Sequence, residues 1–241
     1  MKNFLQISLL SIALVGCSSI DYAELSSPVS PSKTQIDRII ALNLSHTESL
    51  KEANKLMDPV LVSTVVKALE ARKLKTDNAT IEAENVAIYA EMVEVSDDNL
   101  KFVGPKISEI NKRNMIGNPE NFDYFLLGSK DKSDGSIQHK LNFSITYTSS
   151  EKRNYSSASY CDKWAGCDSE NLMDIALISS KASGCTAYEC NYNEIVELNL
   201  DDDFLRNNMG EDFSVSFNSK AANNKITFTS PYLKGYLSVA Y

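Results

Sequence analysis

The spacing of apolar residues changes along this chain, and this change constrains the fold more than any other sequence feature. In residues 34–73 apolar side chains recur at intervals of three and four, which indicates helices. Beyond Ala79 apolar and polar residues alternate, as they do in half-buried strands. We therefore expect a helical segment at residues 34–76 and a β-rich domain at residues 77–241, in an α+β fold that is mainly β.

The dipeptide Asp58-Pro59 marks the clearest helix start, because it joins an N-cap acceptor to a residue that suits the first helical position. The helix is expected to run from Val60 to Lys73 and to end in basic residues, as the helix dipole favours. Its many valines also suit a strand, but the capping signal favours a helix. Before it, shorter helices are predicted with a buried stripe at Ile36, Ile39, Ile40, Leu50, Ala53, Leu56 and Met57.

A seven-residue repeat follows, because residues 81–87 and 88–94 share the pattern I-x-A-E-x-V-x. Positions one, three and six of a heptad scatter around a helix, so this pattern does not form the single stripe of a coiled coil. We predict short strands here, with a bulge or tight corner near residues 84–85 and 91–92, where the alternation slips. Two copies do not establish a β-solenoid, which stays open as the alternative to a β-sandwich.

The rest of the chain predicts an antiparallel, sandwich-like body. Alternating segments lie at Phe122–Leu127, Leu141–Tyr147, Glu194–Leu200, Phe213–Phe217 and Ile226–Phe228. The last two segments are expected to form a hairpin around residues 222–224. Ser230 and Pro231 then predict a short C-terminal helix.

The first 16 residues have the organisation of a signal peptide. A basic start at Lys2 precedes an apolar run at Phe4–Val15, which is shorter than the roughly 20 residues of a bilayer span. The run ends in Leu14-Val15-Gly16-Cys17, which resembles the lipobox of bacterial lipoproteins. The resemblance implies that residues 1–16 are removed and that Cys17 becomes the lipid-bearing first residue of the mature chain.

The same resemblance implies a location. Ser18, rather than Asp, follows the lipidated cysteine, which in that family implies delivery to the outer membrane. The membrane is then a partner through the lipid anchor, with the body at either the periplasmic face or the cell surface. Residues 17–33 are rich in Ser and Pro and are expected to form a flexible tether. The body itself resembles lipoproteins of unknown function.

Four cysteines remain once Cys17 is assigned to the lipid, namely Cys161, Cys167, Cys185 and Cys190. An even number in an exported chain predicts disulfides, because the cell envelope is oxidising. Three pairings are possible, and we favour the two local loops, Cys161 with Cys167 and Cys185 with Cys190. Zinc is the alternative, but these spacings are wider than those of most four-cysteine zinc sites. We expect no metal ion and no cofactor.

Five aromatic residues surround these loops, and four of them are candidate binding residues. Aromatic side chains on stapled loops suit stacking on sugars or anchoring a partner protein, because they combine a large rigid surface with a polar tip. The favoured alternative is that they pack on the disulfides and cover the end of a sheet. The aromatic residue outside the candidate set is Tyr155, and the candidates are Tyr160, Trp164, Tyr188 and Tyr192.

Composition and motifs exclude several functions. The net charge of -8 and the isoelectric point near 4.9 argue against nucleic-acid binding, which needs a basic face. Three adjacent carboxylates at Asp201–Asp203 are explained by the N-cap and acidic first turn of a short helix. The segment Asp131–Gly135 is better explained as a turn than as a calcium loop, because the closing acidic ligands are missing.

No sequence motif assigns a catalytic residue. The two histidines, His46 and His139, stand alone, and no nucleophile, metalloprotease or nucleotide-binding motif is present. We therefore expect a non-catalytic binding or envelope-assembly and maintenance module, with an envelope protein or a glycan as its partner. The alternatives are a surface adhesin and an envelope hydrolase acting on cell-wall or polysaccharide substrates. The carboxylates available to a hydrolase are Asp162, Asp168, Glu170, Glu189 and Glu194.

Overall fold

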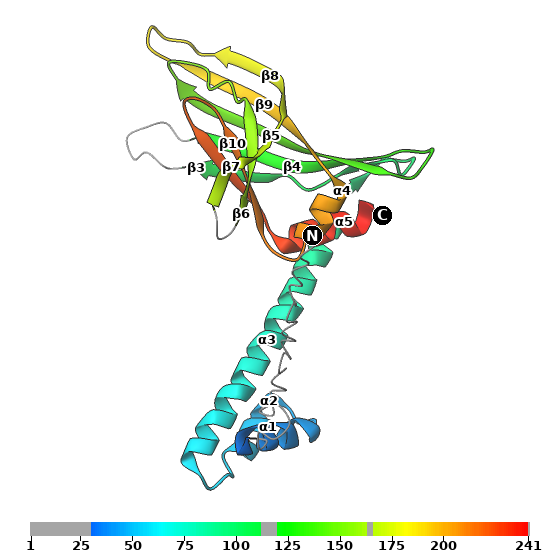
Figure 1. The fold of residues 1–241 in the computed structure, drawn as a ribbon, viewed down its shortest axis with the longest axis vertical. Helices are drawn as coiled ribbons and strands as arrows, with labels where there is room; N and C mark the ends of the chain where they lie inside the picture. The colour runs from blue at the N-terminus through cyan, green and yellow to red at the C-terminus, as the bar shows by residue number, and fades with distance from the viewer. Residues whose placement is uncertain (1–29, 112–119, 163–165, 241) are drawn as a thin grey trace, which may run out of the picture. The chain divides into compact units, whose positions relative to one another are not determined.

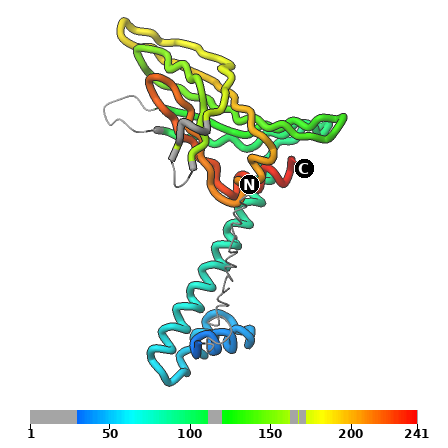
Figure 2. Tube along the Cα trace, viewed as in Figure 1, coloured from blue at the N-terminus to red at the C-terminus, as the bar shows by residue number. Residues whose placement is uncertain are grey.

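The computed structural model describes residues 30–111, 120–162 and 166–240. The predicted signal peptide, the predicted lipidation site Cys17, most of the predicted tether and Trp164 therefore lie outside the described residues. The chain divides into two compact units, with the boundary between Lys75 and Thr76. The helix α3 (Pro59–Glu91) begins in the first unit and ends in the second (Figures 1 and 2).

The first unit is helical, as predicted. It contains α1 (Pro31–Ala41), α2 (His46–Ala53) and the start of α3. The predicted N-cap is confirmed, because Asp58 Oδ1 accepts a hydrogen bond of 2.8 Å from the backbone N–H of Val60. The four buried residues that join the helices are Ile39, Ala53, Val65 and Leu69.

Two details of this unit differ from the sequence-based expectation. The first helix begins at Pro31, three residues inside the predicted tether, because proline is tolerated in the first turn, where its missing N–H costs nothing. Met57, predicted to be buried, is 99% exposed. It follows the end of α2 and so falls outside the helical stripe that placed it in the core.

The strands predicted at residues 79–91 are wrong, because α3 continues to Glu91. Within the second unit the partly buried positions of this segment are Glu82, Val86, Tyr89 and Ala90, spaced as one face of a helix. Apolar residues on another face, such as Ile81 and Ile88, are exposed. The two apolar faces together produce the spacing of two that resembles a strand.

The β-rich body consists of two antiparallel sheets, as predicted. The larger sheet has the strand order β1-β2-β4-β5-β9-β8, and β3 pairs with β4 beside β2. Its strands are β1 (Glu94–Val95), β2 (Lys101–Val103), β3 (Ile107–Asn111), β4 (Glu120–Lys130), β5 (Ile137–Ser149), β8 (Ile175–Ser183) and β9 (Cys190–Leu200). The smaller sheet has the order β11-β10-β6-β7, made of β6 (Ser157–Asp162), β7 (Gly166–Met173), β10 (Phe213–Asn218) and β11 (Asn223–Phe228).

The two sheets pack face to face through aromatic side chains. Every second residue of β4, β5 and β9 is buried, as half-buried strands require. Across the interface the rings of Phe143 and Phe217 stack with centroids 4.3 Å apart. The ring of Phe228 meets Tyr124 edge to face at 5.2 Å. These contacts place the core between the sheets and confirm the sandwich-like architecture.

Two helices complete the body, α4 (Asp202–Asn208) and α5 (Ser230–Ala240). The α5 residue Tyr232 accepts a hydrogen bond from the backbone N–H of Leu126 and donates one to the carbonyl of Pro105. Gly235 of α5 lies so close to α3 that a Cβ there would be 2.7 Å from the Cβ of Tyr89. The predicted C-terminal helix is therefore present, and it joins the end of α3 to the larger sheet (Figure 1).

Candidate functional site

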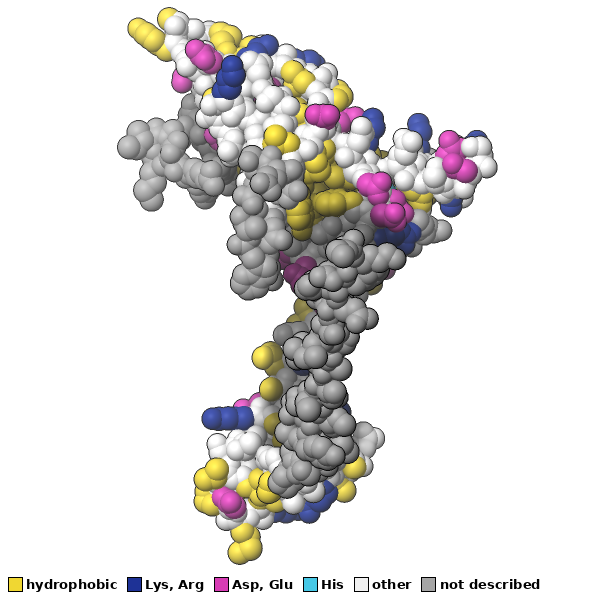
Figure 3. Space-filling view, viewed as in Figure 1, with side chains coloured by type: hydrophobic (Ala, Val, Ile, Leu, Met, Phe, Trp, Pro, Cys, Tyr) yellow, Lys and Arg dark blue, Asp and Glu magenta, His cyan; other side chains and the backbone are white. Residues whose placement is uncertain are grey.

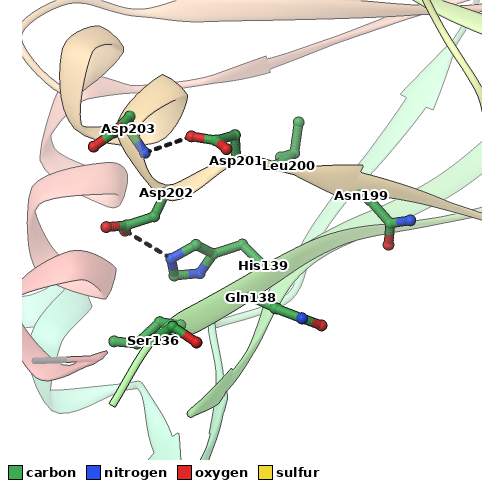
Figure 4. A pocket seen from close by; sticks show the side chains of 9 residues that line it. Ser136, Gln138, His139, Asn199, Leu200, Asp201, Asp202 and Asp203 are labelled. Carbon is green, nitrogen blue, oxygen red and sulfur yellow. Dashed lines mark hydrogen bonds and ion pairs between the residues drawn. The ribbon is translucent and has the colours of Figure 1, made fainter. Parts of the chain in front are cut away.

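A pocket of about 650 Å³ lies where β5 begins and β9 passes into α4. Asp201, which caps α4, and Asp202 and Asp203 in its first turn line one side of the pocket, and Asp202 points toward His139 near the start of β5 (Figure 4). The lining residues are Ser136, Ile137, Gln138, His139, Asn199, Leu200, Asp201, Asp202 and Asp203.

The floor of this pocket is a buried histidine with a partner on each ring nitrogen. His139 occupies an inward-facing position of β5 and is 1% exposed. Its Nε2 lies 3.0 Å from Asp202 Oδ1 in α4, and its Nδ1 lies 3.0 Å from the hydroxyl of Tyr236 in α5. A neutral imidazole with its proton on Nε2 satisfies both contacts, donating to Asp202 and accepting from Tyr236.

The electrostatics agree with that proton assignment. Burial lowers the pKa of His139, and this desolvation outweighs the opposing effect of the Asp202 carboxylate. Burial also raises the pKa of Tyr236, which keeps its hydroxyl protonated as a donor. The three residues therefore form a neutral-histidine network that links β5, α4 and α5.

Two of the three carboxylates at the pocket, those of Asp201 and Asp202, are already bound within the protein. Asp201 caps α4 by accepting hydrogen bonds from the backbone N–H groups of Asp203 and Phe204. Asp202 accepts from His139 and also pairs with Arg206 at 3.0 Å. The predicted N-cap is confirmed. Among the residues that the structure describes, no group of three His, Cys, Asp or Glu side chains is placed to hold a metal ion.

A second polar network lies between the two sheets, around Arg153. Its guanidinium hydrogen-bonds to Tyr155 and Asn224 at 3.1 Å each, pairs with Glu120, and stacks 4.2 Å from the ring centre of Tyr147. Burial raises the pKa of Tyr155 to about 12, although the nearby guanidinium opposes the shift. The network joins β4, β5 and β11, and it is a structural feature of the core.

One hydrolase candidate, Glu194, belongs to this part of the core. Its side chain is fully buried, and its Oε1 accepts hydrogen bonds of 3.3 Å from the backbone N–H of Asn154 and from Ser180. Its Oε2 has no partner among the described residues. A carboxylate inside the core does not reach a polymeric substrate. The side chains of the candidates Asp162, Asp168 and Glu170 lie outside the described part of the structure.

Both predicted disulfides are present in the favoured local pairing, Cys161 with Cys167 and Cys185 with Cys190. The first joins β6 to β7, and the second closes the turn between β8 and β9. Within the second loop Tyr188 is 87% exposed. Figure 3 shows hydrophobic side chains projecting at the turn between β8 and β9.

The loop closed by Cys185 and Cys190 is also held by hydrogen bonds. The backbone N–H of Thr186 donates to the carbonyl of Glu189 at 2.8 Å. The Thr186 hydroxyl oxygen accepts from the backbone N–H groups of Tyr188 at 3.2 Å and Glu189 at 3.1 Å. The loop therefore presents an exposed aromatic side chain on a backbone that is fixed in advance.

The three candidate aromatic residues that the structure describes, Tyr160, Tyr188 and Tyr192, do not form one cluster. Tyr160 packs against Phe204 and Phe213 of the core, and its hydroxyl donates to Asn208 in α4 at 2.9 Å. Tyr192 is buried against Tyr147. Tyr160 contacts α4, which follows the last residue of β9, whereas Tyr188 precedes its first residue, so roughly 30 Å of strand separates them.

No protein-family model matches this chain, and no curated protein is significantly similar to it. Within the described residues, no helix has the length and apolar character needed to cross a bilayer.

The His139 network was missed in the sequence, because its partners lie 63 and 97 positions away. The one sequence signal was that His139 occupies an inward-facing position of an alternating strand. A polar side chain buried there needs hydrogen-bond partners.

Proposed function

We propose that this protein is a lipid-anchored component of the outer membrane that binds another envelope protein without catalysing a reaction. The anchor is Cys17, and the recognition element is the loop Cys185–Cys190, which we call the stapled loop. The exposed Tyr188 on this loop is the observation that carries the proposal.

Physical chemistry favours a protein partner at this loop. A side chain that is 87% exposed gains a large apolar contact when a partner covers it. Because the disulfide and the Thr186 hydrogen bonds already fix the backbone, little conformational entropy is lost on binding. Stacking on a glycan usually uses a platform of several aromatic rings, whereas Tyr160 and Tyr192 are packed into the body. A single projecting tyrosine suits insertion into a pocket on another protein.

Site-specific photocrosslinking in living cells tests the proposal. A photoreactive phenylalanine analogue at position 188 is expected to give one discrete adduct with an envelope protein. The same analogue at the exposed position Lys220, in the turn between β10 and β11, is the matched control and is expected to give none. Tyr188→Ala is then expected to weaken binding of the purified partner about 30-fold. Absence of an adduct, or equal adducts at both positions, would refute the proposal.

An envelope hydrolase has less support. The described pocket contains three carboxylates, but Asp201 and Asp202 are bound within the protein, and both nitrogens of His139 are occupied. A surface adhesin requires that the body of the protein lie on the cell surface. Protease treatment of intact cells tests this orientation, because a body on the cell surface is digested whereas a body in the periplasm is protected.

A further inference from the structure

The end of α3 carries a second apolar face that is not buried against the described residues. In residues 76–91 the side chains at positions two and six of the seven-residue repeat face the body. These residues are Glu82, Val86 and Tyr89. Glu82 pairs with Lys234 of α5, and the ring of Tyr89 packs against Tyr232. Positions one and five lie one residue earlier, and therefore about 100° around the helix. We call Ile81, Asn85 and Ile88, together with Met92 directly after the helix, the outer seam of α3; the backbone N–H of Met92 still donates to the carbonyl of Ile88.

The outer seam is accessible and regularly spaced. Ile81, Ile88 and Met92 are 54%, 53% and 53% exposed, and Asn85 is also exposed. Hydrophobic side chains are visible along α3 in Figure 3. The intervals of four, three and four are those of the a and d positions of a coiled coil, and an asparagine at one a position is a device that fixes the register of a partner helix.

Charge indicates what kind of helix fits the seam. Residues 76–91 contain four acidic residues and no lysine or arginine. Glu84 and Glu91 lie on the open flank of the seam, both exposed, and neither side chain has an ion pair among the described residues. On the other flank, Glu82 is paired with Lys234. Pairing this segment with itself in a second copy would bring acidic flanks together, whereas a basic flank would be attracted.

We propose that the outer seam of α3 is a docking site for an amphipathic helix of another protein, with apolar residues at heptad spacing and Lys or Arg beside Glu84 and Glu91. The site is independent of the stapled loop, so it adds a second binding surface to the molecule. In such helix-in-groove contacts the bound helix inserts apolar side chains spaced three and four residues apart.

Two designed three-heptad peptides test the proposal with the purified mature protein. They share one apolar seam and differ only in their flanks, which are all Lys or all Glu. We expect the Lys-flanked peptide to bind at least about tenfold more tightly than the Glu-flanked one, measured by fluorescence anisotropy. We expect Ile81→Ser with Ile88→Ser to weaken the Lys-flanked peptide at least about tenfold. The matched control is Ile178→Ser on β8, because Ile178 is as exposed as Ile88, at 53%.

A charge-reversal variant distinguishes loss of the docking site from loss of folding. Glu84→Lys with Glu91→Lys should invert the preference, so that the Glu-flanked peptide binds more tightly. The exposed pair Glu151→Lys and Glu189→Lys should leave the preference unchanged, and so should Tyr188→Ala. Equal loss in the Ile178 control, no loss in the seam variant, or no inversion would overturn the proposal. It would also be overturned if the wild type were a dimer that Ile81→Ser with Ile88→Ser dissociates, because the occupant would then be a second copy.

Discussion

At the scale of single residues, the body is stabilised by buried polar side chains whose hydrogen-bond partners are far away in sequence. His139 connects Asp202 and Tyr236, and Arg153 connects Glu120 and Asn224. Buried polar groups need partners, and fully satisfied networks fix one arrangement of the elements. The sequence showed inward and outward positions along each strand, but it could not pair these groups, because hydrogen bonding across the core carries no periodic signal.

The His139 network predicts a loss of stability in mild acid. Because burial lowers the pKa of His139 in the folded protein, the unfolded chain binds a proton more readily. The stability it contributes is present above the unfolded value near 6.5 and declines as the pH falls below it, by up to about 1.4 kcal/mol per pH unit. Urea unfolding followed by circular dichroism at pH 7.5, 6.5 and 5.5 measures this slope.

His139→Gln is the comparison variant for that measurement, because glutamine does not titrate. The variant should be less stable at pH 7.5 but should lose less further stability between pH 7.5 and 5.5 than the wild type. Equal slopes in the two proteins would contradict the assignment of a neutral histidine.

At the scale of elements, α3 shows where sequence patterns succeed and where they fail. The N-cap at Asp58 was predictable because it depends on adjacent residues. The strands of the sandwich and the hairpin of β10 and β11 were predictable because each has one buried face. Residues 79–91 were mistaken for strands because a helix with two apolar faces does not show a single period. Packing against α5, which lies about 150 residues later in the chain, stabilises this segment as a helix.

The contact between α3 and α5 predicts a specific effect of Gly235→Ala. The added Cβ would lie 2.7 Å from Tyr89 Cβ and 2.8 Å from the carbonyl oxygen of Val86, so one helix must shift. We expect a net loss of about 1–2 kcal/mol, because overpacking costs about 1–3 kcal/mol and the better helix propensity of alanine returns up to about 1. Gly210→Ala is the control, because nothing lies within 4 Å of its added Cβ. Denaturant midpoints that match for the two variants would disprove this account.

At the scale of the whole molecule, the proposed lipid anchor would determine where the two proposed binding surfaces act. We predict that Cys17→Ser moves the protein from the membrane fraction to the soluble fraction, because the mature chain then carries none of the acyl chains that stable attachment requires. Immunoblots of fractionated cells provide the measurement. Tyr188→Ala is the control and should remain in the membrane fraction. Persistence of the Cys17 variant in the membrane would show that another segment holds it there.

The position of β9 has a mechanical consequence. This strand lies between β5 and β8, pairs with β5 from Cys190 to Leu200, and carries the stapled loop at its first residue. Antiparallel hydrogen bonds lie perpendicular to the strands, so a force applied along β9 loads all of them in shear at the same time. A partner that pulls on the stapled loop along this strand therefore loads the β5–β9 ladder in shear over its whole length, because β8 and β9 leave the loop together and move as one hairpin. The resistance of the loop to tension then depends on the pairing of β9 with β5.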